Sequence, residues 1–230
     1  MAQKHLNEIA FIIQSRLNST RIPGKMLRPF AGSSLFEIAL DKVLSSNYIP
    51  KENFYASLYD EDLKSIAESK NVNIYHRSEH SVSESKDTRV VSEWHDKLDY
   101  KYFVSINPCC PLLQIQTIEN FVKYYLECPH EGLFGVRSVK NFYWNSDGEL
   151  ITKYPGALDT KCVENTYEAA HCLYAGSMDR ISKGIYLGHF TKNDPALYMI
   201  EEKETFDVDY EWQFRSAEVL YENRKYVLND

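Results

Sequence analysis

Short apolar runs alternate along this chain with segments whose apolar residues recur at the spacing of a helix. Residues 9–13 are all apolar, which is typical of a parallel strand covered on both faces. Leu35, Ile38 and Ala39 show the helical spacing. On these grounds we predict strands at residues 9–13, 53–58, 72–75, 102–106, 133–139 and 172–175 and in a segment that ends at 208. We predict helices at residues 35–44, 60–67, 85–98, 115–126, 177–183 and 211–221.

The alternation of strands and helices predicts an α/β fold, Rossmann-like, with a mostly parallel sheet and helices on both faces. After residue 139 the pattern changes to an aromatic, turn-rich section, which predicts an excursion from the sheet, an arm at residues 140–170. The sequence has no internal repeat, no low-complexity segment and no linker. We therefore expect residues 1–230 to form a single domain with this arm.

Composition narrows the class of protein. The chain has 230 residues, of which 43% are hydrophobic and 26% charged, and this suits one α/β domain. No apolar run approaches the ~18 residues of a membrane helix, and the N-terminus lacks a signal-peptide stretch, so we expect a cytoplasmic protein without a membrane partner. The net charge of -7 and the pI near 5.6 argue against nucleic-acid binding. The five cysteines lack Cys-x-x-Cys spacing, so buried free thiols are expected.

Within this acidic chain, the segment after the first predicted strand is basic. Four positive charges fall within thirteen residues there: Arg16, Arg21, Lys25 and Arg28. Such a loop leaves the carboxyl end of its strand, where open α/β sheets bind ligands. The planar fork of arginine and the point charge of lysine both suit phosphate, and Ser19 adds a neutral donor. The alternative is a solvated surface loop that happens to be basic.

Two common phosphate-binding motifs are absent from this segment. It lacks the Gly-x-x-x-x-Gly-Lys-Ser/Thr of a Walker A loop, and it has one glycine where a dinucleotide fingerprint needs three. The sequence therefore argues against a P-loop ATPase and against a Rossmann dehydrogenase.

A pair of aspartates, Asp207 and Asp209, lies near the other end of the chain. Residues i and i+2 of a strand face the same side, so the two carboxylates would lie together. Mg²⁺ takes one or two carboxylates together with substrate phosphates and waters, which this pair could supply opposite the basic loop. The alternative is that Asp209 only caps the helix predicted to begin at residue 211.

Both motifs resemble those of the sugar-acid cytidylyltransferases, which include the acylneuraminate, pseudaminic acid and 3-deoxy-manno-octulosonate cytidylyltransferases. The N-terminal string that carries the resemblance is Arg16-x-x-Ser19-Thr20-Arg21-x-Pro23-Gly24-Lys25. The Asp207-Val208-Asp209 segment is similar to the Asp-x-Asp motif of the first two branches. The resemblance implies that Arg16 and Lys25 hold the phosphates of CTP and that both aspartates serve the metal. It also implies that the excursion exchanges with a partner subunit, so a homodimer is expected.

Two further segments resemble the family's sugar site and also depart from it. Residues 105–112 stand where the family carries Leu-Gln-Pro-Thr-Ser-Pro-Leu, which implies that Asn107 takes the place of the glutamine near the sugar. Cys109 and Cys110 stand where the family has two hydroxyl side chains. The octulosonate branch carries a metal-binding aspartate in this region that is missing here, which favours the acylneuraminate-like metal arrangement.

Residues 167–176 resemble the Tyr-x-Asp-Ala-Gly-x-Phe-Tyr-x-Gly of the pseudaminic branch, where this segment lines the sugar pocket. The resemblance implies that Glu168, His171 and Tyr174 contact the substrate. His171 replaces a glycine and would narrow the pocket and add a titratable group, although a structural histidine is an equal alternative.

Residues 75–85 resemble the family's loop over the nucleotide base. Arg77 and Ser83 are therefore candidate contacts to the base or ribose, with an ordinary loop as the alternative. For Asp60, a helix cap is a simpler interpretation than a nucleotide contact.

The resulting hypothesis is a Mg²⁺-dependent cytidylyltransferase that joins CTP and an acidic sugar, a nonulosonic or octulosonic acid, to give a CMP-sugar and pyrophosphate. The sugar oxygen would attack the α-phosphorus in line, with Arg16, Arg21 and Lys25 on the triphosphate. Two alternatives stay open. One is a nucleotidyltransferase that acts on a sugar phosphate or another phosphorylated alcohol, and the other is a non-catalytic nucleotide-binding homologue.

Overall fold

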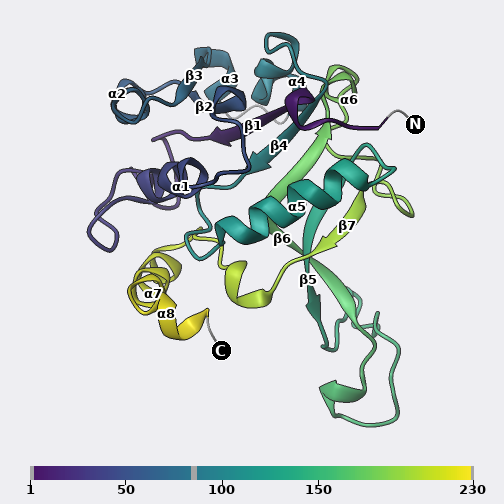
Figure 1. The fold of residues 1–230 in the computed structure, drawn as a ribbon. Helices are drawn as coiled ribbons and strands as arrows, with labels where there is room; N and C mark the ends of the chain where they lie inside the picture. Colours follow the sequence, from purple (N-terminus) through teal and green to yellow (C-terminus); the bar gives the residue numbers. More distant parts are fainter. Residues whose placement is uncertain (1–2, 84–86, 229–230) are drawn as a thin grey trace.

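One mixed sheet forms the centre of the protein in the computed structural model, which describes residues 3–83 and 87–228 (Figure 1). Its seven strands lie in the order β3-β2-β1-β4-β6-β5-β7 within the described residues. β6 is antiparallel to β4 and β5, and the other neighbouring pairs are parallel. The strands are β1 (Ile9–Gln14), β2 (Phe54–Leu58), β3 (Asn73–His76), β4 (Tyr102–Ile106), β5 (Leu133–Val139), β6 (Thr166–Ser177) and β7 (Ala196–Met199).

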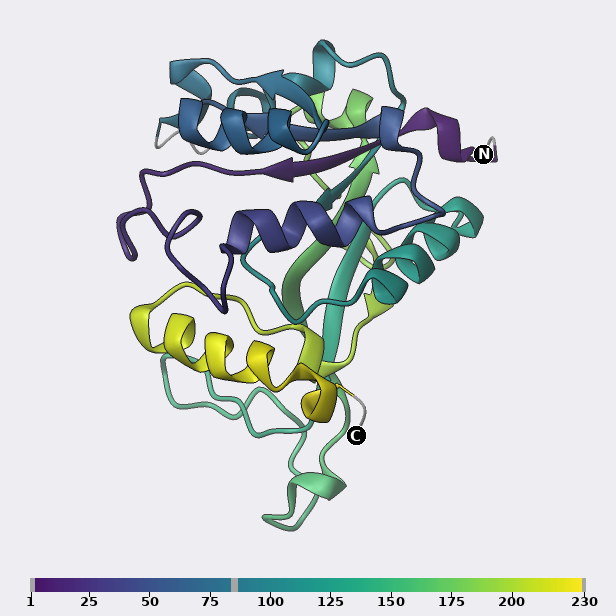
Figure 2. The same ribbon diagram turned by 60° about the vertical axis from the view of Figure 1, so that its left-hand side comes forward.

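Helices cover both faces of this sheet, as predicted (Figures 1 and 2). The α-helices are α1 (Leu35–Leu44), α2 (Glu61–Ser69), α3 (Glu79–Val82), α4 (Thr88–Val91), α5 (Ile115–Glu127), α6 (Met178–Ser182), α7 (Glu211–Glu222) and α8 (Arg224–Val227). The 3-10 turns are η1 (Leu6–Glu8), η2 (Lys51–Asn53), η3 (Glu93–Asp96), η4 (Thr160–Cys162) and η5 (Glu202–Glu204). The fold is therefore of the predicted α/β class.

The strand β1 shows how the apolar run is covered on both sides. Phe11 and Ile13 pack in the cluster that includes residues of α1, α5 and α7. Ala10 and Ile12 point to the other face and pack with Trp94 and with α6. Alternate residues of a strand face opposite sides, so a strand between two helical layers is apolar throughout.

β1 and β4 are parallel neighbours, and the strands that follow β1 in the chain, β2 and β3, lie on its other side. The order in which strands are added to the sheet therefore reverses between β1 and β4. In open α/β sheets, ligands bind in the crevice outside the carboxyl ends of the strands at such a reversal. The loop at residues 15–34 leaves β1 at this point and lies beside α7 in both ribbon views (Figures 1 and 2). Ser34 ends the loop by capping α1, because its side chain accepts a hydrogen bond from the Glu37 amide.

The helix predicted at residues 85–98 is wrong. In its described part, α4 ends at Val91 and a separate 3-10 turn carries Trp94, while residues 85–86 lie outside the described residues. The indole of Trp94 is buried against Phe103, with ring centroids 5.2 Å apart, and donates to the Gln14 amide oxygen at 3.0 Å. Burying this large side chain breaks the helix after Val91, where Ser92, His95 and Asp96 have modest helix propensity.

The strand predicted to end at residue 208 is also wrong. β7 ends at Met199 and is followed by η5. The chain leaves the sheet because buried Glu204 caps α5, where it accepts hydrogen bonds from the Gln114 amide and the Thr117 hydroxyl, each at 2.9 Å. The Val208 amide then donates to the Cys109 carbonyl at 3.0 Å, which holds the extended segment at the end of β4.

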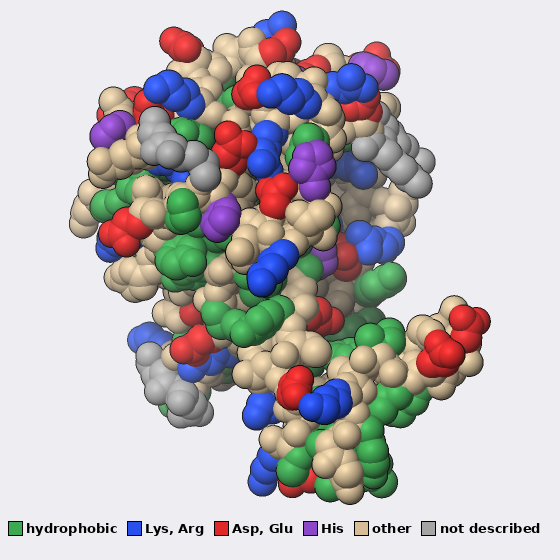
Figure 3. Space-filling model, turned by 90° about the vertical axis from the view of Figure 1, so that its right-hand side faces the viewer, with side chains coloured by type: hydrophobic (Ala, Val, Ile, Leu, Met, Phe, Trp, Pro, Cys, Tyr) green, Lys and Arg blue, Asp and Glu red, His purple; other side chains and the backbone are tan. Residues whose placement is uncertain are grey.

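The excursion from the sheet spans residues 140–165, since β6 begins at Thr166 and not at the predicted residue 172. It projects from one end of the protein, and apolar side chains are visible on it (Figure 3). Its exposed large side chains are Trp144, Ile151, Tyr154 and Leu158.

The five cysteines are free, but the prediction that they are buried fails for Cys162, which is exposed on the arm, and Cys109 is only partly buried. No helix within the described residues has the length and apolar character needed to cross a bilayer.

Candidate active site

The basic loop and the aspartate pair meet in space. Arg21 donates through both terminal nitrogens to Asp209, with nitrogen–oxygen distances of 2.9 and 2.8 Å. The Lys25 Nζ donates to the Val208 carbonyl at 2.6 Å and lies 3.5 Å from Asp209 Oδ1. Two cations that precede α1 thus converge on a carboxylate that precedes α7.

Lys25 is the more enclosed of these cations, with a side chain that is 10% exposed. Gly24 has a φ of 63°, in the left-handed region that favours glycine, and this turn directs the following lysine inward. Cys109 lies near the Lys25 amine, and burial raises the pKa of its thiol to about 11. The lysine charge is therefore available to oxygen ligands, because the neighbouring thiol is neutral near neutral pH.

The other loop residues are placed differently. Arg16 is exposed and donates to the carbonyl of Val82, the last residue of α3, at 3.0 Å. The Ser19 hydroxyl accepts from the Ile22 amide at 3.3 Å, within the loop. Arg28 forms a forked pair with Glu211 at 2.6 and 2.9 Å. Arg16 therefore lies apart from the Asp209 contacts, and Arg28 pairs with α7.

Asp60 has a role that the sequence interpretation missed. It precedes α2 but its side chain makes no capping hydrogen bond there. Its carboxylate instead accepts from the Leu17 amide at 3.0 Å and so fixes the start of the basic loop.

The two candidates for the nucleotide base contact the protein itself. Arg77 is buried, donates to the Ser81 hydroxyl at 2.9 Å and also contacts the Ser81 carbonyl. Burial lowers the pKa of Arg77 to about 10. The Ser83 hydroxyl donates to the His80 carbonyl at 2.6 Å. Both residues support the turn around α3, and neither lines the cavity described below.

Asn107 connects the end of β4 with the segments around it. Its side-chain nitrogen donates to the His171 carbonyl at 2.8 Å and lies 3.4 Å from Asp207 Oδ1. Its side-chain oxygen accepts from the Cys109 amide at 2.9 Å. The structure therefore brings Asn107, His171 and Asp207 together.

His171 marks a bend in β6. Its φ is 55°, and a residue other than glycine is uncommon in this left-handed region. The imidazole Nδ1 lies 3.1 Å from the Tyr174 hydroxyl, and this contact orients the ring. Holding a histidine in this conformation costs on the order of 1 kcal/mol or more, so the surrounding contacts must maintain the bend.

Asp207 and Asp209 form an acidic pair with unequal surroundings. Burial, and next the charge of Asp209, raises the pKa of Asp207, while Lys25 and His171 act in the opposite direction. The Asp207 side chain lines a cavity of about 320 Å³. Glu168, His171 and Arg137 also line this cavity.

Arg137 was missed by the sequence interpretation. It lies on β5, directly opposite Glu168 of β6, and pairs with it through Nε at 2.7 Å. The signal in the sequence is a single arginine within the otherwise apolar or small residues 133–139.

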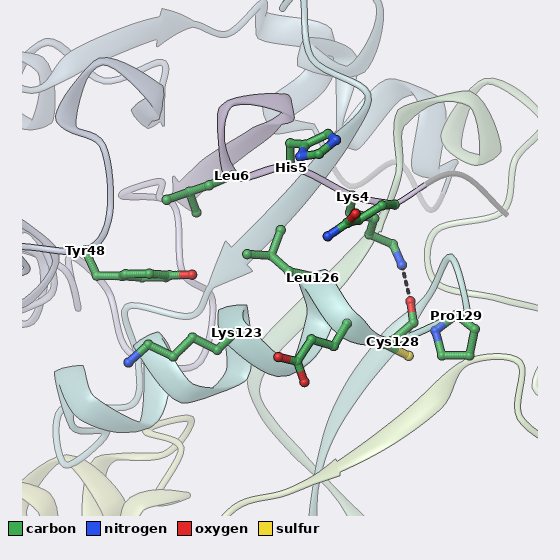
Figure 4. Close-up of a pocket in the computed structure, with 10 residues that line it drawn as sticks. Lys4, His5, Leu6, Tyr48, Lys123, Leu126, Cys128 and Pro129 are labelled. Atoms are coloured by element: carbon green, nitrogen blue, oxygen red, sulfur yellow. Dashed lines mark hydrogen bonds between the residues drawn. The ribbon is translucent and has the colours of Figure 1, made fainter.

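A larger cavity, of about 680 Å³, lies between the N-terminal segment and α5 (Figure 4). Its cations already have partners, since Lys4 donates to the Cys128 and His130 carbonyls and Lys123 lies 5.0 Å from the centre of the Tyr48 ring. None of the residues singled out from the sequence lines it. Two other cavities, of about 570 and 650 Å³, also contain no candidate site residue. The smaller cavity that Asp207 lines is therefore the candidate site.

The residues present fit a magnesium ion. Among the described residues, no group of three or more histidine, cysteine, aspartate and glutamate side chains is arranged to hold a metal. Asp207 and Asp209 offer hard oxygen ligands, and Mg²⁺ is usually held by one or two carboxylates with phosphate oxygens and waters. The donor set thus suits Mg²⁺ better than a metal that needs a complete cage of protein ligands.

Comparison with solved structures supports the fold assignment. CMP:2-keto-3-deoxy-manno-octonic acid synthetase in complex with CTP has a TM-score of 0.70 at 12% identity, over 94% of this chain and 99% of that chain. 4-Diphosphocytidyl-2C-methyl-D-erythritol synthase from Anaerococcus prevotii has a TM-score of 0.63 at 14% identity, over 92% of this chain and 94% of that chain. At such low identity the likeness is one of fold.

Comparison by sequence gives the family. The spore coat polysaccharide biosynthesis protein SpsF of Bacillus subtilis is 38% identical over 65 residues, which are 27% of this chain and 27% of that protein. This chain therefore aligns with about a quarter of that relative. The family model described as cytidylyltransferase matches residues 10–227, nearly the whole chain, and so the chain belongs to the cytidylyltransferase family.

Proposed function

We propose that this protein transfers CMP from CTP to the hydroxyl of an acidic sugar, a nonulosonic or octulosonic acid, with Mg²⁺ and with release of pyrophosphate. The observation that carries the proposal is the convergence of Arg21 and Lys25 on Asp209, beside the cavity that Asp207 lines. The site thus has cations that suit a triphosphate and carboxylates that suit a metal. Both lie beside a cavity that could hold the acceptor.

Positioning and charge neutralisation account for catalysis in this proposal. Arg16, Arg21 and Lys25 bind the triphosphate, and Ser19 supports the loop between them. Asp207 and Asp209 hold Mg²⁺, which when bound offsets the charge of the phosphates. The acceptor oxygen bonds to the α-phosphorus as the bond to pyrophosphate breaks.

The acceptor binds in the cavity of about 320 Å³, next to Asn107, Glu168, His171 and Tyr174. Two relatives support a sugar acceptor by their names, one a synthetase for the CMP derivative of an octonic acid and the other a spore coat polysaccharide protein. The exposed apolar side chains of the arm support a homodimer, since such side chains are usually covered in an assembly.

Pyrophosphate release from a panel of nucleoside triphosphates and acceptors tests the proposal. We expect CTP to be used and a sugar acid to be the best acceptor. N-acetylneuraminate should be poorer than another nonulosonic or octulosonic acid, because His171 lines this cavity where the resembling family has a glycine and Asn107 is shorter than the family's glutamine. A lost hydrogen bond costs about ten- to a hundredfold in efficiency.

These same departures favour a second candidate, in which the acceptor is a sugar phosphate or another phosphorylated alcohol. Turnover of such an acceptor without turnover of any sugar acid would replace the first proposal. Binding of CTP without turnover of any acceptor would indicate a non-catalytic nucleotide-binding protein.

A further inference from the structure

The candidate acceptor cavity contains a cation that the proposed mechanism does not use. Arg137 is the one lysine or arginine among the described residues that line this cavity. Arg21 and Lys25 do not line it, and both already contact Asp209. An acceptor in this cavity therefore meets the charge of Arg137 directly.

The pair that Arg137 forms with Glu168 leaves room for exchange. Nε and Nη2 of Arg137 approach the same oxygen of Glu168, Oε2, at 2.7 and 2.6 Å. Nη1 makes only a long contact of 3.4 Å with the Thr205 hydroxyl. Two nitrogens of Arg137 thus share a single acceptor oxygen of Glu168. A ligand carboxylate or phosphate could instead place a separate oxygen at each nitrogen, which is the preferred forked geometry.

The energy of this pair also permits exchange. The side chains of Arg137 and Glu168 are 30% and 50% exposed, and ion pairs at such exposure contribute little to stability. An incoming anion can therefore displace Glu168 at small cost. Glu168 would then be free to accept hydrogen bonds from hydroxyl groups of the same ligand.

The charges around the cavity make this exchange selective. Asp207 also lines the cavity, and Asp209 is two residues away from it in the chain. A negatively charged acceptor is repelled by these carboxylates unless a cation compensates, and a neutral sugar gains nothing by displacing Glu168.

We infer that Arg137 binds the anionic group of the acceptor, a carboxylate or a phosphate, in exchange for Glu168, and so determines acceptor specificity and orientation. The inference rests on the proposed function for the identity of the cavity. With the anionic group at Arg137, the rest of the acceptor extends toward Asp207, where the triphosphate cations and the proposed metal ligands meet.

The test compares the wild type with Arg137→Gln in steady-state pyrophosphate release. We expect the KM for the best anionic acceptor to rise about ten- to a hundredfold, the size of a lost charge-assisted contact, with the KM for CTP unchanged. Arg137→Lys should recover part of the loss, because it keeps the charge but not the fork. Lys183→Gln is the matched control, since Lys183 also belongs to an exposed ion pair, with Asp179.

A binding measurement separates this inference from the proposed function. Isothermal titration with 3-deoxy-manno-octulosonate as a carboxylate probe and glycerol 3-phosphate as a phosphate probe needs no turnover. Weaker binding to Arg137→Gln than to the wild type and Lys183→Gln supports the inference, and the probe more affected identifies the anionic group. Equal binding of both probes to the wild type and Arg137→Gln overturns the inference, even if CTP is turned over. Absence of turnover with selective loss of probe binding overturns the proposed function instead.

Discussion

Replacing Arg21 by glutamine should have opposite effects on the two ligands of the proposed active site. In the structure, Arg21 holds both oxygens of Asp209, at 2.9 and 2.8 Å. In the proposed site a metal ion competes with Arg21 for the carboxylate of Asp209, whereas the triphosphate uses the Arg21 charge. The change Arg21→Gln therefore removes a competitor of the metal and a ligand of the nucleotide.

The structure sets the size of each effect. The side chains of Arg21 and Asp209 are 50% and 31% exposed, so their pair contributes about 1 kcal/mol or less. Its loss should tighten metal binding in the absence of nucleotide by about two- to fivefold. A charge-assisted contact to phosphate contributes about 1.5–3 kcal/mol, so CTP binding should weaken by about ten- to a hundredfold.

Terbium luminescence measures the metal, because Tyr210 directly follows Asp209, Trp212 is three residues after it, and either ring can sensitise the ion. Isothermal titration measures CTP in the absence of an acceptor. Arg28→Gln is the control, because Arg28 pairs with Glu211 at 2.6 and 2.9 Å and not with Asp209. Weaker or unchanged metal binding in Arg21→Gln, relative to this control, would refute the argument that the ion pair competes with the metal.

Three further outcomes are expected. Lys25→Ala should lower CTP turnover by about 10²-fold with unchanged thermal melting, because the variant loses an enclosed cation that we propose binds the phosphates. Near-normal kinetics of this variant would show that Lys25 does not belong to the active site. Asp209→Asn should lose the activation by Mg²⁺ that chelation and readdition reveal in the wild type, since a neutral amide is a poor ligand for this ion, and a normal Mg²⁺ titration would contradict this. Burial lowers the pKa of Lys42 from 10.5 to about 8, so between these values the folded protein binds fewer protons there than the unfolded chain. The free energy of unfolding of the wild type should therefore rise with pH over this range by up to about 3 kcal/mol relative to Lys42→Met, and parallel pH curves from urea unfolding would exclude it.

Local patterns in the sequence were sufficient to predict the class of fold. A strand buried on both faces needs an apolar residue at every position, and residues 9–13 satisfy this without reference to any distant part of the chain. The residue types for phosphate and metal chemistry could be named in the same way, because a basic loop after such a strand and an Asp-x-Asp pair are both local. These features depend on neighbours within a few residues.

Where local preference was weak, the tertiary structure decided which secondary structure formed. Residues 85–98 have helical spacing, but in the described part the burial of Trp94 against Phe103 breaks the helix. Residues 205–208 alternate polar and apolar side chains as a strand does, but the capping of α5 by Glu204 takes this segment out of the sheet. In both places one long-range contact outweighs propensities that amount to a fraction of a kcal/mol per residue.

Contacts between charged groups also depended on the tertiary structure. Arg21 and Asp209 are 188 residues apart, and Arg137 meets Glu168 only because the register of β5 and β6 aligns them. A shift of one residue in that register would turn one of the two side chains to the other face of the sheet. The sequence by itself determined which charges the protein carries and near which strands they lie. The order and register of the strands, which bury the apolar faces, determined which of these charges meet.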